Sequence, residues 1–242
     1  MITLLIIIII YMKIDIVTLF PKIFNEFLNK GLLSKAIEKQ IISINLVNVR
    51  VFAKDNRVDD RPFGGGVGMV IKPEPLYEAI KSTGVKRKNA SYKYCYNKPY
   101  VIYMTPQGSL LNNNIILDLT KFKHLVIVCG HYEGIDERVL NYIDKEISIG
   151  DYVLSGGEIP AMALVDATVR MLPGVLNPKS IINDSFFCNL LDFPNYTRPA
   201  VFRGYTVPKV LLSGNHKEIQ KWRDKQAYIK TKTRRPDLLL QK

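Results

Sequence analysis

The sequence predicts an α/β fold with a mainly parallel sheet, followed by a smaller helical unit. Short apolar, β-branched runs alternate with helix-like segments along most of the chain, a pattern typical of parallel sheets covered by helices. Hydrophobic residues make up 47% of the 242 residues, which is enough for a full core. Because the chain is about 1.6 times a typical domain length, we expect a second, smaller unit.

The first eleven residues are almost wholly apolar, and Met12-Lys13 ends the run. The run is too short to cross a bilayer, which takes about 20 residues, and it lacks the basic start and cleavage site of a signal peptide. We interpret residues 1–11 as an extension produced by a misassigned start, with Met12 as the true start. An extra edge strand is the alternative. Residues 13–20 then predict the first strand.

The next segments continue the alternation. Residues 23–28 resemble a helix, residues 41–51 are β-rich, and residues 73–80 predict a further helix. The runs 100–104 and 125–128 are short, continuous and β-branched, which predicts buried parallel strands.

A basic segment, residues 81–98, interrupts this pattern. It holds six Lys and Arg, no acid, and three interleaved tyrosines. We expect an exposed loop, and a tolerated surface insertion is favoured over a direct RNA contact.

A helix is predicted after Glu158 and ends at Pro173-Gly174. Ser155 and Glu158 match the spacing of a capping box at its start, although Pro160 would also suit a first turn slightly later. Arg170 lies on this otherwise apolar helix, and we expect it close to the glycine-rich loops that precede the helix. The main domain therefore spans residues 12–174.

The remaining chain divides into a linker and a small basic unit. Residues 175–190 are polar and aperiodic, which predicts an interdomain linker. Ser213-Gly214-Asn215 caps a helix in a helical domain over 191–242. From Lys209 onward there are ten Lys and Arg against three Asp and Glu.

Charge and cysteine usage limit the partners and the compartment. The formal net charge is +12 with a pI near 9.5, which favours a polyanion, above all a nucleic acid, as partner. The three cysteines are odd in number and show no CxxC spacing. A disulfide framework and a structural zinc site are therefore unsupported, and a reducing cytoplasm is the simplest location.

Two short strands each run into a glycine-rich loop that carries acids and an aromatic ring, at residues 130–138 and 149–157. Glycine lets a backbone approach a ligand closely, and a loop that feeds a helix presents unpaired N–H groups. This combination predicts a pocket for a small polar cofactor. Dinucleotide, phosphate-loop and zinc-deaminase signatures are all incomplete.

Asp184 and Arg170 are the remaining candidates for chemistry. Asp184 precedes Ser185-Phe186-Phe187 in the linker, and bulky apolar residues are unusual there unless something docks on them. An isolated acid is more often simply solvated, and an arginine near a helix end more often interacts with the helix dipole. The pattern alone leaves both roles open.

Six runs in one order resemble the bacterial tRNA (guanine-N1)-methyltransferases that modify guanosine 37, the TrmD family of the SPOUT superfamily. The resemblance extends from Met12 to the C-terminus, and the departures are the N-terminal extension, the basic segment 81–98 and a short end. The runs are VDDRPFGGG at 58–66, GHYEGIDER at 130–138, IGDYVLSGGE at 149–158, DSF at 184–186, YTRP at 196–199 and LLSGNH at 211–216.

The resemblance implies a trefoil-knotted domain whose three knot loops hold S-adenosylmethionine in a bent shape. It implies no metal ligands, and the backbone near Leu154 and Gly156 would contact the adenine. The implied cofactor-binding residues are Tyr103, Met104, Thr105, Pro106, Gly130, Tyr132, Glu133, Ile149, Gly150, Tyr152, Leu154, Gly156 and Gly157.

The resemblance also implies the catalytic roles. Asp184 would be the general base that removes the N1 proton of guanine, and Arg170 would stabilise the charge that develops on O6. The family is homodimeric, with the active site between subunits, and the basic C-terminal unit would bind the anticodon stem-loop of tRNA. A non-catalytic RNA-binding protein, or an enzyme of the same fold acting on ribosomal RNA or a ribose hydroxyl, are the alternatives.

Overall fold

The chain folds into two compact units that divide between Leu176 and Asn177, inside the segment expected to be a linker. The computed structural model describes residues 12–86, 95–182 and 184–240. The extension 1–11 and residues 87–94 of the basic segment lie outside the described residues.

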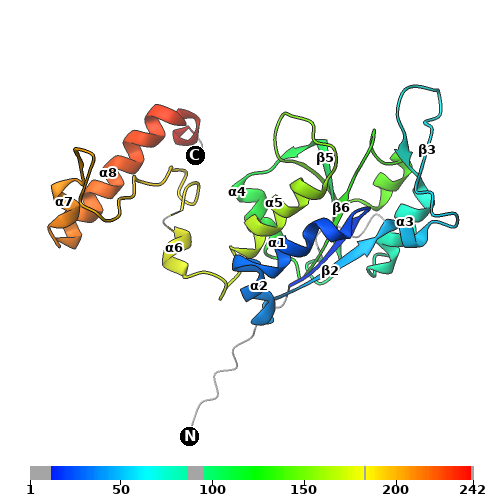
Figure 1. Ribbon diagram of the computed structural model, residues 1–242, viewed down its shortest axis with the longest axis horizontal. Coiled ribbons are helices and arrows are strands. Elements are labelled where there is room, and N and C mark those ends of the chain that lie inside the picture. Colours follow the sequence, from blue (N-terminus) through cyan, green and yellow to red (C-terminus); the bar gives the residue numbers. More distant parts are fainter. Residues whose placement is uncertain (1–11, 87–94, 183, 241–242) are drawn as a thin grey trace, which may run out of the picture. The chain divides into compact units, whose positions relative to one another are not determined.

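The larger unit is built on a five-stranded sheet with the order β2-β1-β6-β5-β7, in which every neighbouring pair is parallel (Figure 1). The expected α/β fold with a mainly parallel sheet is therefore confirmed. Two further strands, β3 (Asp59–Asp60) and β4 (Val70–Ile71), form a small antiparallel ribbon. The sheet strands are β1 (Met12–Thr18), β2 (Ile42–Asn48), β5 (Tyr100–Leu110), β6 (His124–Cys129) and β7 (Lys145–Ser148).

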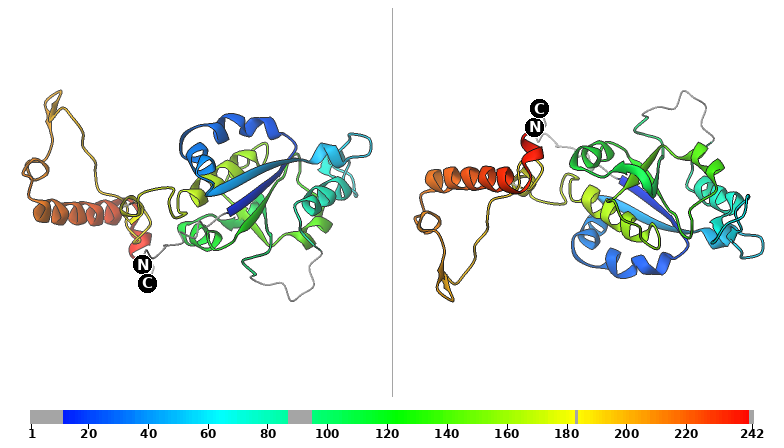
Figure 2. Two further views of the ribbon diagram at one scale, coloured as in Figure 1. Left: turned by 90° about the horizontal axis from the view of Figure 1, so that it is seen from below. Right: turned by 90° about the horizontal axis from the view of Figure 1, so that it is seen from above.

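Helices cover both faces of this sheet because successive strand residues point to opposite sides. In β1, Ile14 and Ile16 pack into the core beneath α1, α2, α4 and α5, while Val17 packs into the core beneath α3. Figures 1 and 2 show α3 across the sheet from α1 and α2. The helices are η1 (Pro21–Phe24), α1 (Asn25–Asn29), α2 (Gly31–Glu38), η2 (Val49–Phe52), α3 (Pro73–Ser82), α4 (Asn113–Leu119), η3 (Glu137–Tyr142) and α5 (Glu158–Val169).

Two strand boundaries differ from the sequence-based expectation. The β-rich stretch ends as a strand at Asn48, because the Asn48 side chain accepts a hydrogen bond from the Arg50 amide (3.0 Å) and turns the chain into η2. Strand β5 continues well past Met104. Its pairing with β7 shifts register between Met104 and Ser109, so the chain bulges out and then rejoins the sheet.

The expected capping box at the start of α5 is wrong. Gly157 occupies the N-cap position without a side-chain hydrogen bond, and Glu158 is the first helical residue. The Glu158 carboxylate instead accepts a hydrogen bond from the Thr18 hydroxyl of β1 (2.8 Å). The Glu158 side chain therefore bonds to Thr18, which is distant in sequence, and not to the backbone at the start of its own helix as the spacing suggested.

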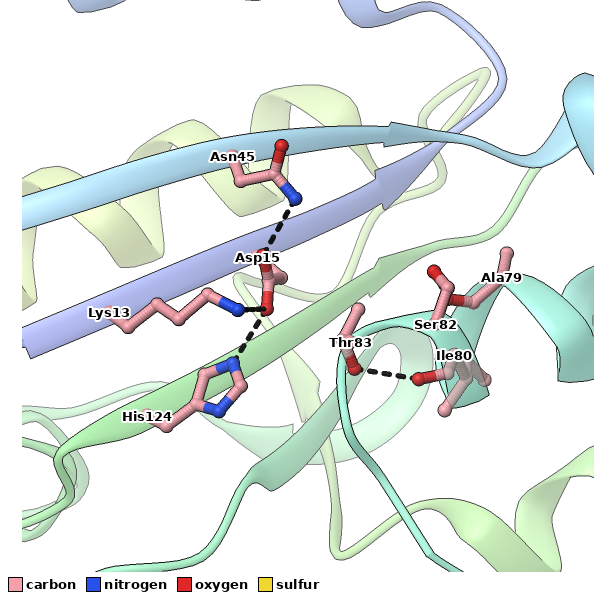
Figure 3. A network of polar contacts seen from close by, with 8 residues as sticks. All are labelled: Lys13, Asp15, Asn45, Ala79, Ile80, Ser82, Thr83 and His124. Carbon is pink, nitrogen blue, oxygen red and sulfur yellow. Dashed lines mark hydrogen bonds and ion pairs between the residues drawn. The ribbon is translucent and has the colours of Figure 1, made fainter.

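A polar cluster links three neighbouring strands (Figure 3). The fully buried Asp15 of β1 accepts hydrogen bonds from Asn45 of β2 (2.9 Å), lies 2.6 Å from His124 of β6, and pairs with Lys13 (2.9 Å). Burial raises the pKa of Asp15, but the hydrogen bonds from His124, Lys13 and Asn45 together lower it below its ordinary value. Asp15 is therefore a buried carboxylate held in its charged form.

The smaller unit contains a long helix, α8, whose expected cap is confirmed: the Asn215 side chain accepts from the Glu218 amide (3.3 Å). The segment expected to be a linker contains one short helix, α6. This unit carries thirteen Lys and Arg against five Asp and Glu, so most of the chain's positive excess lies in it. Its elements are α6 (Pro178–Ile182), β8 (Val201–Phe202), β9 (Tyr205–Thr206), α7 (Lys209–Leu212), α8 (His216–Arg234) and η4 (Pro236–Leu239).

Within the parts of both units that the structure describes, no helix combines the length and the apolar character needed to cross a bilayer.

Candidate functional site

A cavity of about 340 Å³ lies where the carboxyl ends of β5, β6 and β7 run into loops. This edge is where open parallel sheets usually bind ligands. The bulge of β5 after Met104, the loop after Cys129 and the loop between Ser148 and α5 form its walls. Three segments far apart in the sequence therefore converge on one site.

All thirteen side chains or backbones that the sequence assigned to cofactor binding line this cavity. The structure thus brings together every residue of that set, while their role in binding remains a prediction. Sequence reasoning missed several lining residues, because they alternate with the predicted ones along the same loops or come from the strand ends. These are Gln107, His131, Gly134, Ile135, Glu137, Leu140, Glu146, Ile147, Ser148, Val153, Ser155 and Pro160.

Glycine is required where two of the loops meet. The Gly157 amide donates a hydrogen bond to the Gly130 carbonyl (2.8 Å). A β-carbon on Gly157 would lie 2.8 Å from the Cys129 Cα and 2.9 Å from the Gly130 nitrogen, closer than such atoms pack. Since both neighbours are backbone, they cannot move aside cheaply. The loop after β6 and the start of α5 are therefore held in direct contact.

Tyr103 forms part of the cavity wall and packs against the same loop. It is only 7% exposed, and a β-carbon on Gly130 would lie 2.8 Å from its hydroxyl oxygen. Burial raises the pKa of the Tyr103 phenol. The group therefore stays protonated at neutral pH and can offer a hydrogen bond to a ligand.

A buried acid stands directly behind the cavity. Glu158 is 4% exposed, and its second carboxylate oxygen lies 3.8 Å from Nδ1 of His131. The His131 ring meets the Phe20 ring edge-on with centroids 5.0 Å apart. Together with the hydrogen bond from Thr18, these contacts tie the β6 loop, α5 and β1 into one rigid wall.

Arg170 is not close to the glycine-rich loops, contrary to expectation. It is the C-cap of α5, and its amide donates to the Asp166 carbonyl (3.1 Å). The cavity contacts the other end of that helix at Gly157 and Pro160. Twelve helical residues separate the ends by about 18 Å at 1.5 Å per residue, so Arg170 does not line the cavity.

Asp184 belongs to the smaller unit and follows α6. It is half-buried, and the Phe186 and Phe187 rings beside it are 41% and 38% exposed. The two residues assigned to catalysis therefore lie in different units, and neither is part of the cavity wall in one copy of the chain.

The cavity carries few groups suited to covalent or metal chemistry. Burial raises the pKa of the Cys129 thiol well above its usual range, so this cysteine is a poor nucleophile. No cluster of three or more His, Cys, Asp or Glu that could hold a metal ion occurs among the described residues. The cavity lining offers backbone amides and carbonyls, the phenols of Tyr103, Tyr132 and Tyr152, and the carboxylates of Glu133, Glu137 and Glu146, which suits non-covalent binding of a polar ligand.

Comparison with known proteins gives a consistent result. A family described as tRNA (Guanine-1)-methyltransferase TrmD matches residues 12–241. A protein of Endomicrobium trichonymphae is 62% identical over 231 residues, covering 94% of this chain and 99% of its own length. Proteins of Nostoc punctiforme and Malacoplasma penetrans are 51% and 48% identical, over 94% and 95% of this chain and 93% and 97% of their own.

All three relatives are named tRNA (guanine-N(1)-)-methyltransferase. The matched family region begins at Met12, so it excludes the apolar extension. Because the match spans nearly the whole chain, the resemblance seen in the six motifs is confirmed, and the chain belongs to the tRNA (guanine-N1)-methyltransferase family.

Proposed function

We propose that this chain transfers a methyl group from S-adenosylmethionine to N1 of guanosine 37, beside the anticodon of tRNA. The observation that carries the proposal is the convergence of two glycine-rich loops and the bulge of β5 on one cavity in a chain of this family. The methyl donor, the position in tRNA and the residue roles go beyond what the relatives' names say.

The cavity fits the proposed donor in size and chemistry. Its volume of about 340 Å³ falls in the usual range for small-molecule sites. The backbone around Leu154 and Gly156 would hold the adenine, and the contact between Gly130 and Gly157 holds together two of the loops that line the site. When bound, S-adenosylmethionine supplies a methyl group already activated by a sulfonium.

The protein's own contribution concerns the proton on guanine N1. N1 is a poor nucleophile until that proton leaves, and we assign its removal to the Asp184 carboxylate. As the proton leaves, negative charge builds on O6 of guanine, and the Arg170 guanidinium would stabilise it by donating hydrogen bonds. Holding N1 in line with the methyl group supplies much of the remaining rate.

A homodimer would reconcile these roles with the geometry. Arg170 lies at the opposite end of α5 from the cavity of its own subunit, so we propose that a second copy supplies it. Large apolar side chains are exposed at the cavity and the start of α5, with Val153 83% and Ile159 55% exposed. Such exposure favours a covering partner. We therefore place the active site between subunits, with the cofactor from one and Asp184 from the other.

The remaining parts of the proposal concern the path of the chain, the RNA and the compartment. We propose that the three cavity loops follow a trefoil-knotted path of the SPOUT type, supported by the contact between Gly130 and Gly157.

The positively charged smaller unit would bind the anticodon stem-loop through its phosphates. Guanosine 37 must leave its stack to enter the pocket. Since tRNA is the substrate, the cytoplasm is the proposed location.

The decisive experiment is transfer of labelled methyl from S-adenosylmethionine to an unmodified tRNA transcript with guanosine at 36 and 37. The same transcript with adenosine at 37 is the control. We expect label on the first transcript alone. Label on both would indicate another target, and label on neither, with folded dimeric protein, would favour a non-catalytic RNA-binding protein.

A further inference from the structure

The smaller unit has a cavity of its own, of about 440 Å³. Its apolar floor includes Val207 and Ile219, and the Tyr196 ring stands at its rim, 49% exposed. Two arginines, Arg198 and Arg223, also line it. An apolar floor, an aromatic rim and guanidinium groups are together suited to a flat, anionic ligand.

Arg223 is the most informative of these residues. Its guanidinium lies over the Phe193 ring, with the central carbon 4.8 Å from the ring centroid. Its Nε is buried and has no hydrogen-bond partner among the described residues. A buried donor without a partner costs free energy. A ligand acceptor that draws the guanidinium toward the cavity would remove this cost.

The aromatic rim is organised for stacking. The Tyr196 ring packs beside the Trp222 ring of α8, with centroids 6.3 Å apart. Proteins recognise unpaired nucleotides by stacking the base on aromatic or arginine planes and by hydrogen bonds to base edges and phosphates. The surrounding unit has thirteen Lys and Arg against five Asp and Glu, so it attracts a nucleic acid in particular.

We propose that this cavity receives one unstacked nucleotide of the tRNA substrate. The base stacks on Tyr196, and Arg198 and Arg223 donate hydrogen bonds to its edge or its phosphate. None of the residues that line this cavity is among those assigned to the methyl donor or to guanosine 37, and the inference rests on the proposed function, because it takes tRNA as the substrate.

The first test compares binding of an unmodified tRNA transcript, without methyl donor, by variants of the full chain. Tyr196→Ala and Arg223→Ala should each weaken binding about tenfold, since stacking one base on an aromatic ring contributes roughly 1–3 kcal/mol. Tyr205→Ala removes an 81% exposed ring outside the cavity, and Lys217→Ala removes one charge from the same helix as Arg223. Both controls should stay within about twofold of the unaltered protein.

A second test uses the unaltered protein, so it does not depend on the folding of any variant. Transcripts with a single abasic site at each unpaired position outside 36–38 are compared for binding. One position should weaken binding about tenfold, and that transcript should lose nothing further with Tyr196→Ala. The inference is overturned if no position does so, or if the cavity variants behave like their controls.

The two proposals fail in different ways. If the unaltered chain methylates tRNA and the cavity variants match their controls, only the nucleotide cavity is wrong. If the unaltered chain binds tRNA but transfers no methyl group, the proposed function is wrong.

Discussion

At the scale of single residues, Asp184 carries the sharpest prediction. Asp184→Asn keeps the size of the side chain but removes the carboxylate that we assign as general base. Methyl transfer should fall by about 10²–10⁴-fold, while affinity for the methyl donor stays within about twofold, because Asp184 does not line the donor cavity. Single-turnover transfer and calorimetric titration of the donor measure the two quantities separately.

Asp224→Asn is the matched control for this change. Asp224 lies in the same unit, on the exposed surface of α8, where it accepts a hydrogen bond from Gln220 (2.7 Å). The control should transfer methyl at the normal rate. A near-normal rate for Asp184→Asn would remove it from the role of base.

Gly157 supports a prediction about the donor cavity. In Gly157→Ala the new β-carbon would meet the backbone of Cys129 and Gly130 at 2.8 and 2.9 Å, so the contact between the two loops has to open. We expect donor affinity to fall at least about tenfold, because opening this contact would cost the donor one to two hydrogen bonds to the loops.

Asp151→Asn, an exposed position in the same loop that does not line the cavity, should bind the donor normally. Thermal unfolding of both variants shows whether the fold survives. Normal donor affinity in Gly157→Ala would mean that the contact between Gly130 and Gly157 does not shape the cavity.

At the scale of elements, the Asp15 cluster couples three strands and makes the sheet sensitive to acid. Because the folded-state pKa of Asp15 is lowered, its contribution to stability is present above the unfolded pKa of about 3.9 and is lost as the pH falls through the folded value. Asp15→Asn should therefore destabilise the protein by about 1–3 kcal/mol at pH 7, and this difference should shrink toward pH 3.

Urea unfolding followed by circular dichroism at pH 7 and pH 3 measures this difference. Asp118→Asn is the control, because the Asp118 side chain is 70% exposed and pairs with Lys121 on the surface. Such pairs contribute about 0–1 kcal/mol. A destabilisation by Asp15→Asn that is equal at both pH values would show that charge is not what Asp15 contributes.

The elements also show how far the sequence predicts this fold. Continuous β-branched runs correctly located β5 and β6, and the cap at Asn215 correctly located α8. The register shift of β5 could not be foreseen, because it depends on pairing with β7 some forty residues later. The capping box failed for the same reason, since the Glu158 carboxylate binds Thr18, 140 residues away. Local patterns predict elements, while tertiary partners set their ends.

The same distinction applies to the candidate site: local patterns predicted its loops, and the fold set their contacts. The glycine-rich loops were recognisable because glycine and acidic residues are concentrated in short runs, and all of the predicted set meets at one cavity. The distance of Arg170 from that cavity follows from the predicted helix itself, because a helix that starts at Glu158 and rises about 1.5 Å per residue places Arg170 at its far end. His131 was part of a recognised motif, but its contact with buried Glu158 depends on the fold.

At the scale of the whole molecule, the two units contribute different groups to the proposed reaction. The larger unit holds the donor cavity, and the smaller unit holds most of the positive excess and Asp184. If the catalytic groups come from different subunits, two variants should restore one another when the donor concentration is low enough that Gly157→Ala is nearly inactive. Asp184→Asn retains the donor cavity, and Gly157→Ala retains the base.

Mixing these two variants in equal amounts, after subunit exchange, tests the arrangement directly. In a symmetric dimer half of the mixed population is heterodimeric, and each heterodimer has one intact site of two, so activity should recover to about a quarter of the unaltered level. Each variant mixed with itself is the control and should stay inactive. If the cofactor and the base acted within one subunit, every subunit in the mixture would still lack one of them, and mixing would restore nothing. Recovery would therefore establish both the dimer and the composite site, in accord with the 18 Å or so that α5 places between Arg170 and its own cavity.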